Sequence, residues 1–361
     1  MKILLELLTP GMITAEDVYS LNGQLLVPIG TPLTDAMLHQ MKIHSIRSVN
    51  IDDHPKAAST ASGHTSDIPE EVRKARVEHI KEYKKAYSEG LSQFEVAINN
   101  LVMNNTDLDM DTILKQTLSV LSPTGRHSSI LEMLVFMKEY NTSIYAHSIN
   151  VSLLCNMLAH WLNYSEEDCQ MAAACGMFHD IGKLTLPEEI LQRRGPLTDE
   201  EKKLVNTHCE KGYELLSKSS VDETVKLAAL MHHELCDGSG YPRNLQSEEI
   251  DRFAKIVTIC NIYDAMTSER PYRKPISPFA VIEYFEVTGL SKFDTRPILV
   301  FLENTVNTYL NSTVQLNDGT TAQVVFINKG RLGRPIVKSG EKFIDLSQRT
   351  DLHIQEILPV V

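Results

Sequence analysis

The sequence contains no apolar run of the roughly 18–20 residues that a helix needs to cross a bilayer. Its leucine-rich start, MKILLELLTPGM, is interrupted by Glu6 and stops at Pro10 and Gly11. This stretch has one lysine and no small-residue cleavage site, so it is a poor match to a secretory signal peptide. The two absences predict a cytoplasmic protein without a membrane span.

The sequence also lacks closely spaced cysteines, because its six cysteines are scattered and form no CxxC pair. Six cysteines would allow a disulfide framework, but without a signal peptide we expect reduced thiols that pack in the core. The spacing also argues against a structural zinc site made of thiolates. The cysteines are Cys155, Cys169, Cys175, Cys209, Cys236 and Cys260.

Positive charge is scarce, with 35 Lys and Arg against 47 Asp and Glu, a formal net charge of −12. This balance disfavours a broad footprint on a nucleic-acid polymer or an anionic membrane. An anionic small molecule is still allowed, but its site would need a local source of positive charge. The apolar content of 42% and charged content of 23% are ordinary for a folded globular chain.

Changes in composition and hydrophobic pattern along the chain predict five structural parts. Residues 1–52 read as a small β-containing module with a short helix over Asp35–Ile43, and residues 53–69 as a linker rich in Ala, Ser, Thr, Gly and Pro. Residues 70–125 read as a helical connector, whose charged part predicts a solvated segment or a stalk that forms a homodimer. Residues 126–312 read as a helical domain. Residues 313–361 read as a small β module, with a hairpin signal at Asn317-Asp318-Gly319.

Histidine and aspartate residues recur in short contexts inside the helical domain. His147 shares a helix face with Val151 and Leu154, and alone it would be read as a core histidine. His179 and Asp180 follow a small-residue helical run, and we expect Gly182 to end that helix, so that both side chains can reach one metal ion. A lysine three residues on, Lys183, is placed to hold a phosphate oxygen beside that metal.

Two further contexts lie downstream. Thr198 and Glu201 form a capping-box pattern, which predicts a helix that carries His208 about two turns from its start. His232 and His233 end the apolar stretch LAALM and open the glycine-rich string HHELCDGSGYP. The last member, Asp264, sits in an otherwise apolar helix, where a carboxylate is costly unless it is paired or bound to metal.

Five imidazoles and two carboxylates without thiolates suit iron, manganese, zinc, nickel or cobalt. They exceed the needs of one ion, and a carboxylate that bridges two ions resolves the excess. Two ions about 3.5–4 Å apart can activate a hydroxide and clamp both oxygens of an in-line displacement at phosphorus. The residues thus predict a binuclear phosphoesterase, and the simpler alternative is a set of buried polar residues that pair with one another.

At these strings the sequence resembles the HD-GYP family, a subgroup of the HD metal-dependent phosphohydrolases. HDIGK at 179–183, HHELCDGSGYP at 232–242 and YDAMTSERPYR at 263–273 match its signature in order and spacing, over about residues 126–310. The resemblance implies a mainly α fold, an HD-type helical bundle, here with small β-containing modules at the N- and C-termini. It also implies hydrolysis of the bacterial second messenger cyclic di-GMP to pGpG or GMP.

The resemblance further implies roles for single residues. One divalent transition-metal ion, iron or manganese, would be held by His147, His179, Asp180 and Asp264. The bridging Asp180 would share a second ion with His208, His232 and His233, and Lys183 would steady the scissile phosphate as a second catalytic residue. The substrate-binding residues would be Lys183, Asp237, Gly238, Gly240, Tyr241, Pro242, Arg270 and Arg273.

Two departures from the family pattern bear on these expectations. Members that bind three metals carry a glutamate where this chain has Ser143, so we expect two metals and no strong third site. The family often has an aspartate where this chain has Asn261, which changes the charge beside the site. The stretch from Arg252 to Lys274 holds five basic and two acidic residues, which predicts a locally positive site.

Two rival functions are left open at this point. The domain could bind cyclic di-GMP as an effector with weak or no catalysis, or it could hydrolyse another nucleotide. The complete ligand set and Lys183 argue against the first rival, and the GYP string favours cyclic di-GMP over other substrates.

Overall fold

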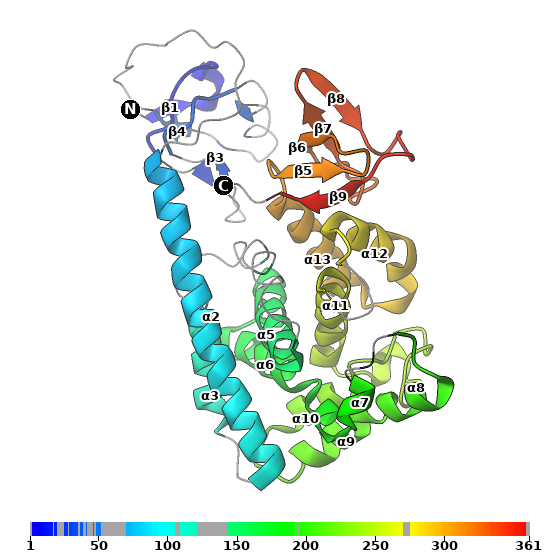
Figure 1. Cartoon of the computed structure of the whole chain (residues 1–361). Helices are drawn as coiled ribbons and strands as arrows, with labels where there is room; N and C mark the ends of the chain where they lie inside the picture. Colours follow the sequence, from blue (N-terminus) through cyan, green and yellow to red (C-terminus); the bar gives the residue numbers. More distant parts are fainter. Residues whose placement is uncertain are drawn as a thin grey trace. The chain divides into compact units, whose positions relative to one another are not determined.

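The computed structural model describes residues 2–16, 18–19, 25–27, 29–34, 37–38, 41, 46, 48–51, 70–104, 109–120, 131, 134, 143–191, 193, 195–269 and 275–358 (Figure 1). The chain divides into two compact units, Met1–Ile68 and Pro69–Val361. Among the described helices, none combines the length and apolar character that crossing a membrane requires.

The first unit is built from two short antiparallel pairs. Strand β1 (Lys2–Leu4) pairs with β4 (Ser48–Asn50), and β2 (Val18–Tyr19) pairs with β3 (Leu25–Val27). A single 3₁₀ turn, η1 (Leu5–Leu7), follows β1. Buried apolar side chains from these segments form a small separate core. Most of the helix expected over Asp35–Ile43 and all of the linker expected over 53–69 lie outside the described residues.

The second unit is mainly helical (Figure 1). In chain order the helices with described bounds are α2 (Glu70–Asn104), α3 (Met110–Leu118), α5 (Ile144–Trp161), α6 (Glu166–Phe178), η3 (Ile181–Thr185), α7 (Glu188–Leu191), α8 (Asp199–Asn206), α9 (His208–Leu216), α10 (Glu223–Met231), η4 (Ser247–Glu249), α11 (Arg252–Thr267), α12 (Pro278–Lys292) and α13 (Thr295–Thr308).

Short polar side chains begin several of these helices by accepting hydrogen bonds from backbone N–H groups that have no partner inside the helix. Ser165 starts α6 and Asp251 starts α11 in this way. The predicted capping box at the start of α8 is confirmed, because Thr198 and Glu201 exchange reciprocal hydrogen bonds.

Helices α5 and α6 form the centre of the core and are buried over most of their length. Small residues in α6 allow the two backbones to approach closely. A side-chain carbon added at Gly176 would lie 2.9 Å from the carbonyl oxygen of Val151, so only glycine fits this contact. Helix α11 packs against both helices and carries Asp264 into the same region.

Helix α2 corrects one expectation, because it is not a solvated connector along all of its faces. Its buried side chains recur at helical spacing and belong to the main hydrophobic core of the second unit. Phe94, for example, packs edge-on against Phe178 of α6, with ring centroids 6.1 Å apart. The buried residues of this face are Tyr83, Tyr87, Phe94, Ile98 and Leu101.

A five-stranded antiparallel sheet follows α13 and consists of β5 (Thr313–Leu316), β6 (Thr321–Phe326), β7 (Ile336–Ser339), β8 (Lys342–Asp345) and β9 (Ile354–Ile357). The strands lie in the order β8-β7-β6-β5-β9. The hairpin predicted at Asn317-Asp318-Gly319 is confirmed, since these residues connect β5 to β6 and Gly319 has a φ of +85°. Only glycine adopts such a φ at no steric cost.

The sheet shares the main core with the helices and is tied to α12 by polar contacts. Glu286 accepts hydrogen bonds from the backbone N–H groups of Leu332 and Gly333, at 2.6 and 2.9 Å. Arg334 pairs with Glu283 at 3.0 Å. The expected fold class, a helical bundle with small β modules near both termini, is thus confirmed, and the division into five parts stays a prediction.

Candidate metal centre

Three of the predicted ligands lie at helix ends, where backbone carbonyls have no partner inside the helix. His179 follows directly after α6, His232 follows directly after α10, and His208 opens α9 just after the end of α8. Each ring donates from Nδ1 to the carbonyl three residues earlier: His179 to Gly176 at 2.7 Å, His208 to Val205 at 2.6 Å and His232 to Ala229 at 2.9 Å.

These hydrogen bonds decide which nitrogen of each ring is available. A carbonyl oxygen only accepts, so Nδ1 must carry the proton in all three histidines. In the neutral ring, Nε2 then keeps a lone pair, and the ring cannot rotate without losing its hydrogen bond. The helix ends therefore hold three ring nitrogens that carry a lone pair and could bind a metal.

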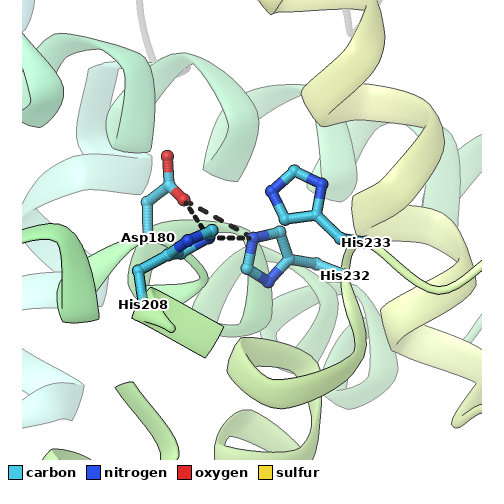
Figure 2. Close-up of side chains that lie close together, drawn as sticks. All are labelled: Asp180, His208, His232 and His233. Atoms are coloured by element: carbon cyan, nitrogen blue, oxygen red, sulfur yellow. Dashed lines mark hydrogen bonds and ion pairs between the residues drawn. The ribbon is translucent and has the colours of Figure 1, made fainter. Parts of the chain in front are cut away.

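The carboxylate of Asp180 lies where these nitrogens converge. Its Oδ2 atom is 3.4 Å from Nε2 of His179 and 3.5 Å from Nε2 of His147. Its Oδ1 atom is 3.4 Å from Nε2 of His208 and 3.5 Å from Nε2 of His232, two contacts that Figure 2 marks with dashed lines. Each carboxylate oxygen thus faces its own pair of imidazoles, which is the arrangement expected of a bridging ligand.

His233 joins the second pair. It lies beside His232, with ring centroids 4.2 Å apart, and belongs to a group with Asp180, His208 and His232 whose ligand atoms lie within 4.8 Å of one another (Figure 2). A second group consists of His147, His179 and Asp180. Asp180 is the member that the two groups share.

Charge around Asp180 keeps it ionised. Burial by itself would raise its pKa, but the ammonium of Lys183 and the neighbouring His179 hold the pKa well below its ordinary value. The Nζ atom of Lys183 lies 2.5 Å from Oδ2, and its side chain is 22% exposed. Lys183 therefore sits between the carboxylate and the solvent-accessible side of the site.

Burial also keeps the second group of histidines neutral. It lowers the pKa of His208 to about 3 and that of His232 to about 4, and it lowers the pKa of His233 as well. Near pH 7 these rings are uncharged. Since only the neutral imidazole binds a metal, protons do not compete for these ligands at physiological pH.

His147 contacts Asp264, the last predicted ligand. Its Nδ1 atom lies 2.7 Å from Oδ2 of Asp264, and its Nε2 atom lies 3.0 Å from Oδ1 of Asn261. Since Nδ1 donates to the carboxylate, Nε2 is the nitrogen that the neutral ring offers to a metal, and the Asn261 amide lies beside it. The structure places Asp264 as the partner of His147 and outside both ligand groups, so direct ligation by Asp264 stays a prediction.

Ser143 has a different task from the glutamate of three-metal family members. It lies one turn before His147 at the start of α5, where its Oγ atom accepts a hydrogen bond from the N–H of Ala146 at 3.2 Å. Two metals remain the expectation.

Two buried atoms test whether the site fits a metal. Nε2 of His179 and Oδ1 of Asp180 have no hydrogen-bond partner among the described residues, which is costly unless another group satisfies them. The Nε2 atoms of His208 and His232 are 3.2 Å apart. Metal–nitrogen bonds of about 2.0–2.1 Å place two ligands of one ion about 3.0–3.5 Å apart. The donor set fits a divalent ion.

Comparison with known proteins agrees with this chemistry. Residues 126–296 match the family model of the HD domain. A cyclic di-GMP phosphodiesterase of Pseudomonas aeruginosa is 40% identical over 150 residues, which cover 41% of this chain and 36% of that protein. A cyclic di-GMP phosphodiesterase response regulator of Xanthomonas campestris is 36% identical over 148 residues, covering 40% of this chain and 39% of that protein. The chain contains an HD-GYP domain.

A third relative has a different printed substrate. The 3'3'-cGAMP-specific phosphodiesterase 2 of Vibrio cholerae is 32% identical over 161 residues, which cover 44% of this chain and 31% of that protein. The chain spans less than two fifths of the length of each of these three relatives. An HD domain implies binding of divalent metal ions, in agreement with the two ligand groups.

The loop that names the HD-GYP domain supports the second ligand group. Tyr241 stacks on His233, with ring centroids 4.6 Å apart and planes 19° apart. A side-chain carbon at Gly240 would lie 2.6 Å from the carbonyl oxygen of His233 and 2.5 Å from Cα of Glu234. The missing side chain of Gly240 thus lets the loop fold back over the histidine pair and bring Tyr241 onto it.

The other loop residues build a turn away from the ligands. Asp237 is exposed and accepts hydrogen bonds from the N–H and hydroxyl of Ser239, at 3.0 and 2.6 Å. Gly238 has a φ of +75°, and Pro242 follows Tyr241 through a cis peptide bond. Substrate contact by these residues stays a prediction. Arg270 and Arg273 lie outside the described residues.

Two expectations about helix ends in the HD-GYP domain are wrong. Helix α6 ends at Phe178, and Gly182 lies inside the following turn η3. His208 is the first residue of α9 and not a residue two turns into α8, because the helix breaks at Thr207. The break exposes the Val205 carbonyl that orients the ring of His208.

The prediction that basic residues between Arg252 and Lys274 make the site positive is also wrong for the first two of them. Arg252 pairs with Asp168 at 2.6 Å, and Lys255 pairs with Asp294 at 3.3 Å, so both charges are committed to other carboxylates. Of the basic residues proposed for the site, Lys183 is the one that the described part of the chain places beside the ligands.

The cysteines belong to the core, as expected. Five of the six are buried, and none forms a disulfide. Burial raises the pKa of Cys209, whose Sγ atom lies 3.5 Å from Nε2 of His208, so the thiol stays protonated. Its role beside the ligand is packing.

Three residues that support the site were missed. Glu234 is buried and accepts hydrogen bonds from the N–H groups of Arg243 and Leu245, at 2.6 and 3.0 Å, which closes the loop. Its place beside the histidine pair was a usable signal, because a buried carboxylate needs partners. Asn150 donates a hydrogen bond to Asp264, and Tyr87 donates one to Asn150. Nothing in the sequence indicated a role for Tyr87.

The depressed pKa values of His208 and His232 predict how the metal-free domain responds to acid. In the unfolded chain histidine has a pKa of about 6.5, so the unfolded state binds protons below that pH. In the folded state His232 binds its proton only near pH 4 and His208 only near pH 3. The contribution of these two histidines to the free energy of unfolding is fully present above pH 6.5. As the pH falls below that value, the free energy of unfolding should decrease by up to about 1.4 kcal/mol per pH unit for each histidine.

Chemical denaturation of chelator-treated protein between pH 7 and pH 4.5 measures this slope. His232→Gln should make the curve flatter, whereas His353→Gln, at an exposed position of the C-terminal sheet region, should leave it unchanged. A free energy of unfolding that stays constant over this range would contradict the assignment of neutral buried rings.

Proposed function

We propose that this chain is a metal-dependent phosphodiesterase that hydrolyses cyclic di-GMP to pGpG, with GMP as a further product. The observation that carries the proposal is the placement of Asp180, whose two carboxylate oxygens face two different pairs of imidazole nitrogens. This geometry suits two divalent ions joined by one carboxylate. Paired ions of this kind can stabilise both the attacking and the leaving oxygen of an in-line displacement at phosphorus.

The proposed ligands divide between the two sides of Asp180. His147 and His179 would hold one ion with Asp180, with Asp264 as a further ligand or as the support of His147. His208, His232 and His233 would hold the other. Iron or manganese is the proposed metal, and the ions would activate water as the nucleophile and neutralise negative charge on the phosphoryl group.

The side chains have their own tasks in this reaction. Oxygen from water bonds to phosphorus, the bond from phosphorus to the ribose 3′ oxygen breaks, and a proton passes to that leaving oxygen. The ammonium of Lys183 is placed to stabilise charge that develops on the phosphoryl oxygens. Because Asp180 stays ionised and the second-group histidines stay neutral, this group of four residues keeps the same charge across the physiological pH range.

The substrate proposal rests on relatives that cover part of this chain. Two of the three are named as cyclic di-GMP phosphodiesterases, and the third acts on 3'3'-cGAMP. These substrates are both cyclic dinucleotides, so the same phosphodiester chemistry serves each. An effector without catalysis is the less supported alternative, because the described residues include Lys183 and the ligands of both groups. A cytoplasmic location and a homodimer stay predictions from the sequence.

A turnover assay tests the proposal. The purified chain, loaded with Mn²⁺ or anaerobically with Fe²⁺, is incubated separately with cyclic di-GMP and with 3'3'-cGAMP, and the linear products are separated by chromatography. We expect about two ions per chain and conversion of cyclic di-GMP to pGpG. Binding without turnover would overturn the enzyme in favour of the effector, and selective cleavage of 3'3'-cGAMP would overturn the substrate.

A lysine variant separates the chemical step from metal binding. Lys183→Gln should lower turnover at least about tenfold, because a charge that stabilises the transition state is lost, while the metal content stays the same. Lys226→Gln is the matched control, since Lys226 pairs with Glu223 at 3.3 Å and lies outside both ligand groups. Equal rates for the two variants would contradict the role of Lys183.

A further inference from the structure

A chain of buried hydrogen bonds links Tyr87 of helix α2 to His147 of the candidate metal centre, through Asn150 and Asp264. The hydroxyl of Tyr87 donates to Oδ1 of Asn150 at 2.7 Å, and it also lies 3.3 Å from the carbonyl oxygen of Ala146. Nδ2 of Asn150 donates to Oδ1 of Asp264 at 3.1 Å. Oδ2 of Asp264 in turn accepts from Nδ1 of His147 at 2.7 Å. All four side chains are at most 5% exposed.

The carboxylate of Asp264 sets the direction of the Asn150 amide, and the Tyr87 hydroxyl holds the other end of that amide. If the amide turned by half a revolution, its oxygen would face the carboxylate of Asp264, and two acceptors would oppose each other in a buried place. By donating to the amide oxygen, the Tyr87 hydroxyl holds the Asn150 amide in place with its NH₂ group directed at Asp264. A correctly held Asp264 then fixes the ring of His147, and such outer partners are what orient metal-binding histidines.

From this geometry we propose that Tyr87 is a positioning residue of the metal centre, acting through Asn150 and Asp264 on His147. The inference rests on the proposed function, because it assumes that His147 binds metal. It makes α2, a helix whose sequence shows no sign of chemistry, part of the support of the site. Tyr87 lies in the second unit, on the first of its described helices.

The same helix provides a matched control one turn earlier. Tyr83 is fully buried like Tyr87, and their rings are 6.2 Å apart, but the hydroxyl of Tyr83 has no hydrogen-bond partner among the described residues. Replacing either tyrosine by phenylalanine keeps the ring and its packing and removes a single oxygen. The two variants therefore differ in whether the lost hydroxyl belongs to the chain that ends at His147.

The experiment compares wild type, Tyr87→Phe, Tyr83→Phe and Asn150→Leu by Mn²⁺ titration of the metal-free full chain. Loss of an outer partner of a metal ligand weakens metal binding about 10–100-fold. We expect a loss of about tenfold for the weaker ion in Tyr87→Phe, a similar or larger loss in Asn150→Leu, and no change in Tyr83→Phe. Adding Tyr87→Phe to Asn150→Leu should weaken binding no further, because the chain is already broken.

Thermal unfolding of the metal-free variants separates positioning from stability. Equal Mn²⁺ affinities for Tyr87→Phe and wild type, or equal losses in Tyr87→Phe and Tyr83→Phe, would overturn the inference. Additive losses of Mn²⁺ affinity in the variant that combines Tyr87→Phe with Asn150→Leu would also overturn it. A wild-type chain that binds no Mn²⁺ would instead refute the proposed metal centre itself, so the two failures are distinguishable.

Discussion

Asp180→Ala should abolish turnover of cyclic di-GMP and strip metal from the protein. One carboxylate faces both ligand groups, so its loss removes a ligand from each at once. Losing an outer partner of a ligand costs about 10–100-fold in metal affinity or activity. Because Asp180 is the proposed ligand of both ions, we expect turnover to fall by more than about a thousandfold. Metal analysis should find fewer than the wild-type number of ions per chain.

The controls for Asp180 address charge and folding. Asp180→Asn keeps the shape of the side chain and one carbonyl oxygen, so it should retain more metal than the alanine variant but lose most of the activity. Asp199→Ala, at an exposed position in the first turn of α8, should behave as wild type. If Asp180→Ala kept its metal and its full rate, the bridging role would be refuted.

Gly182→Ala should damage the centre through the backbone and without changing a ligand. The added carbon would overlap the carbonyl oxygen of His208 and lie 2.5 Å from the backbone nitrogen of Gly212. Backbone atoms cannot rotate away as a side chain can, so α9 would have to move together with His208. Overpacking of this kind costs about 1–3 kcal/mol or more. We expect loss at or above the upper end of that range, with weaker metal binding.

A second buried glycine supplies the comparison. Gly289 lies in α12, and a carbon added there would meet side-chain atoms at 3.6 Å and beyond, which is ordinary contact. Gly289→Ala should be neutral or should stabilise the protein by up to about 1 kcal/mol through helix propensity. Denaturation curves and Mn²⁺ titration of both variants measure the difference. Wild-type metal affinity in Gly182→Ala would contradict the close contact between η3 and α9.

The ligand set was open to prediction because its chemistry is local. Paired strings such as His179 with Asp180 and His232 with His233 stand out in sequence, and the type of ligand indicates the class of metal. The structure brings six of the seven predicted residues together in the two ligand groups, and the seventh, Asp264, contacts His147; their binding of metal stays a prediction.

The details of orientation were not open to prediction. The break at Thr207 has no proline or glycine to mark it, yet it frees the carbonyl that holds the ring of His208. The expected role of Gly182 as a helix end was wrong for a similar reason, because the glycine is required by a backbone from another helix. Both depend on atoms that are distant in sequence.

The amino-acid sequence by itself determined the mainly helical fold, the hairpin of the C-terminal sheet, and the residue types that make a metal centre. These follow from periodicity, turn chemistry and ligand preference, which act over a few residues. Only the tertiary structure decided that each oxygen of Asp180 faces a separate pair of histidines, and that Tyr87 on α2 supports Asp264. Such pairings arise where helices pack together, because packing brings atoms from distant segments within hydrogen-bond distance.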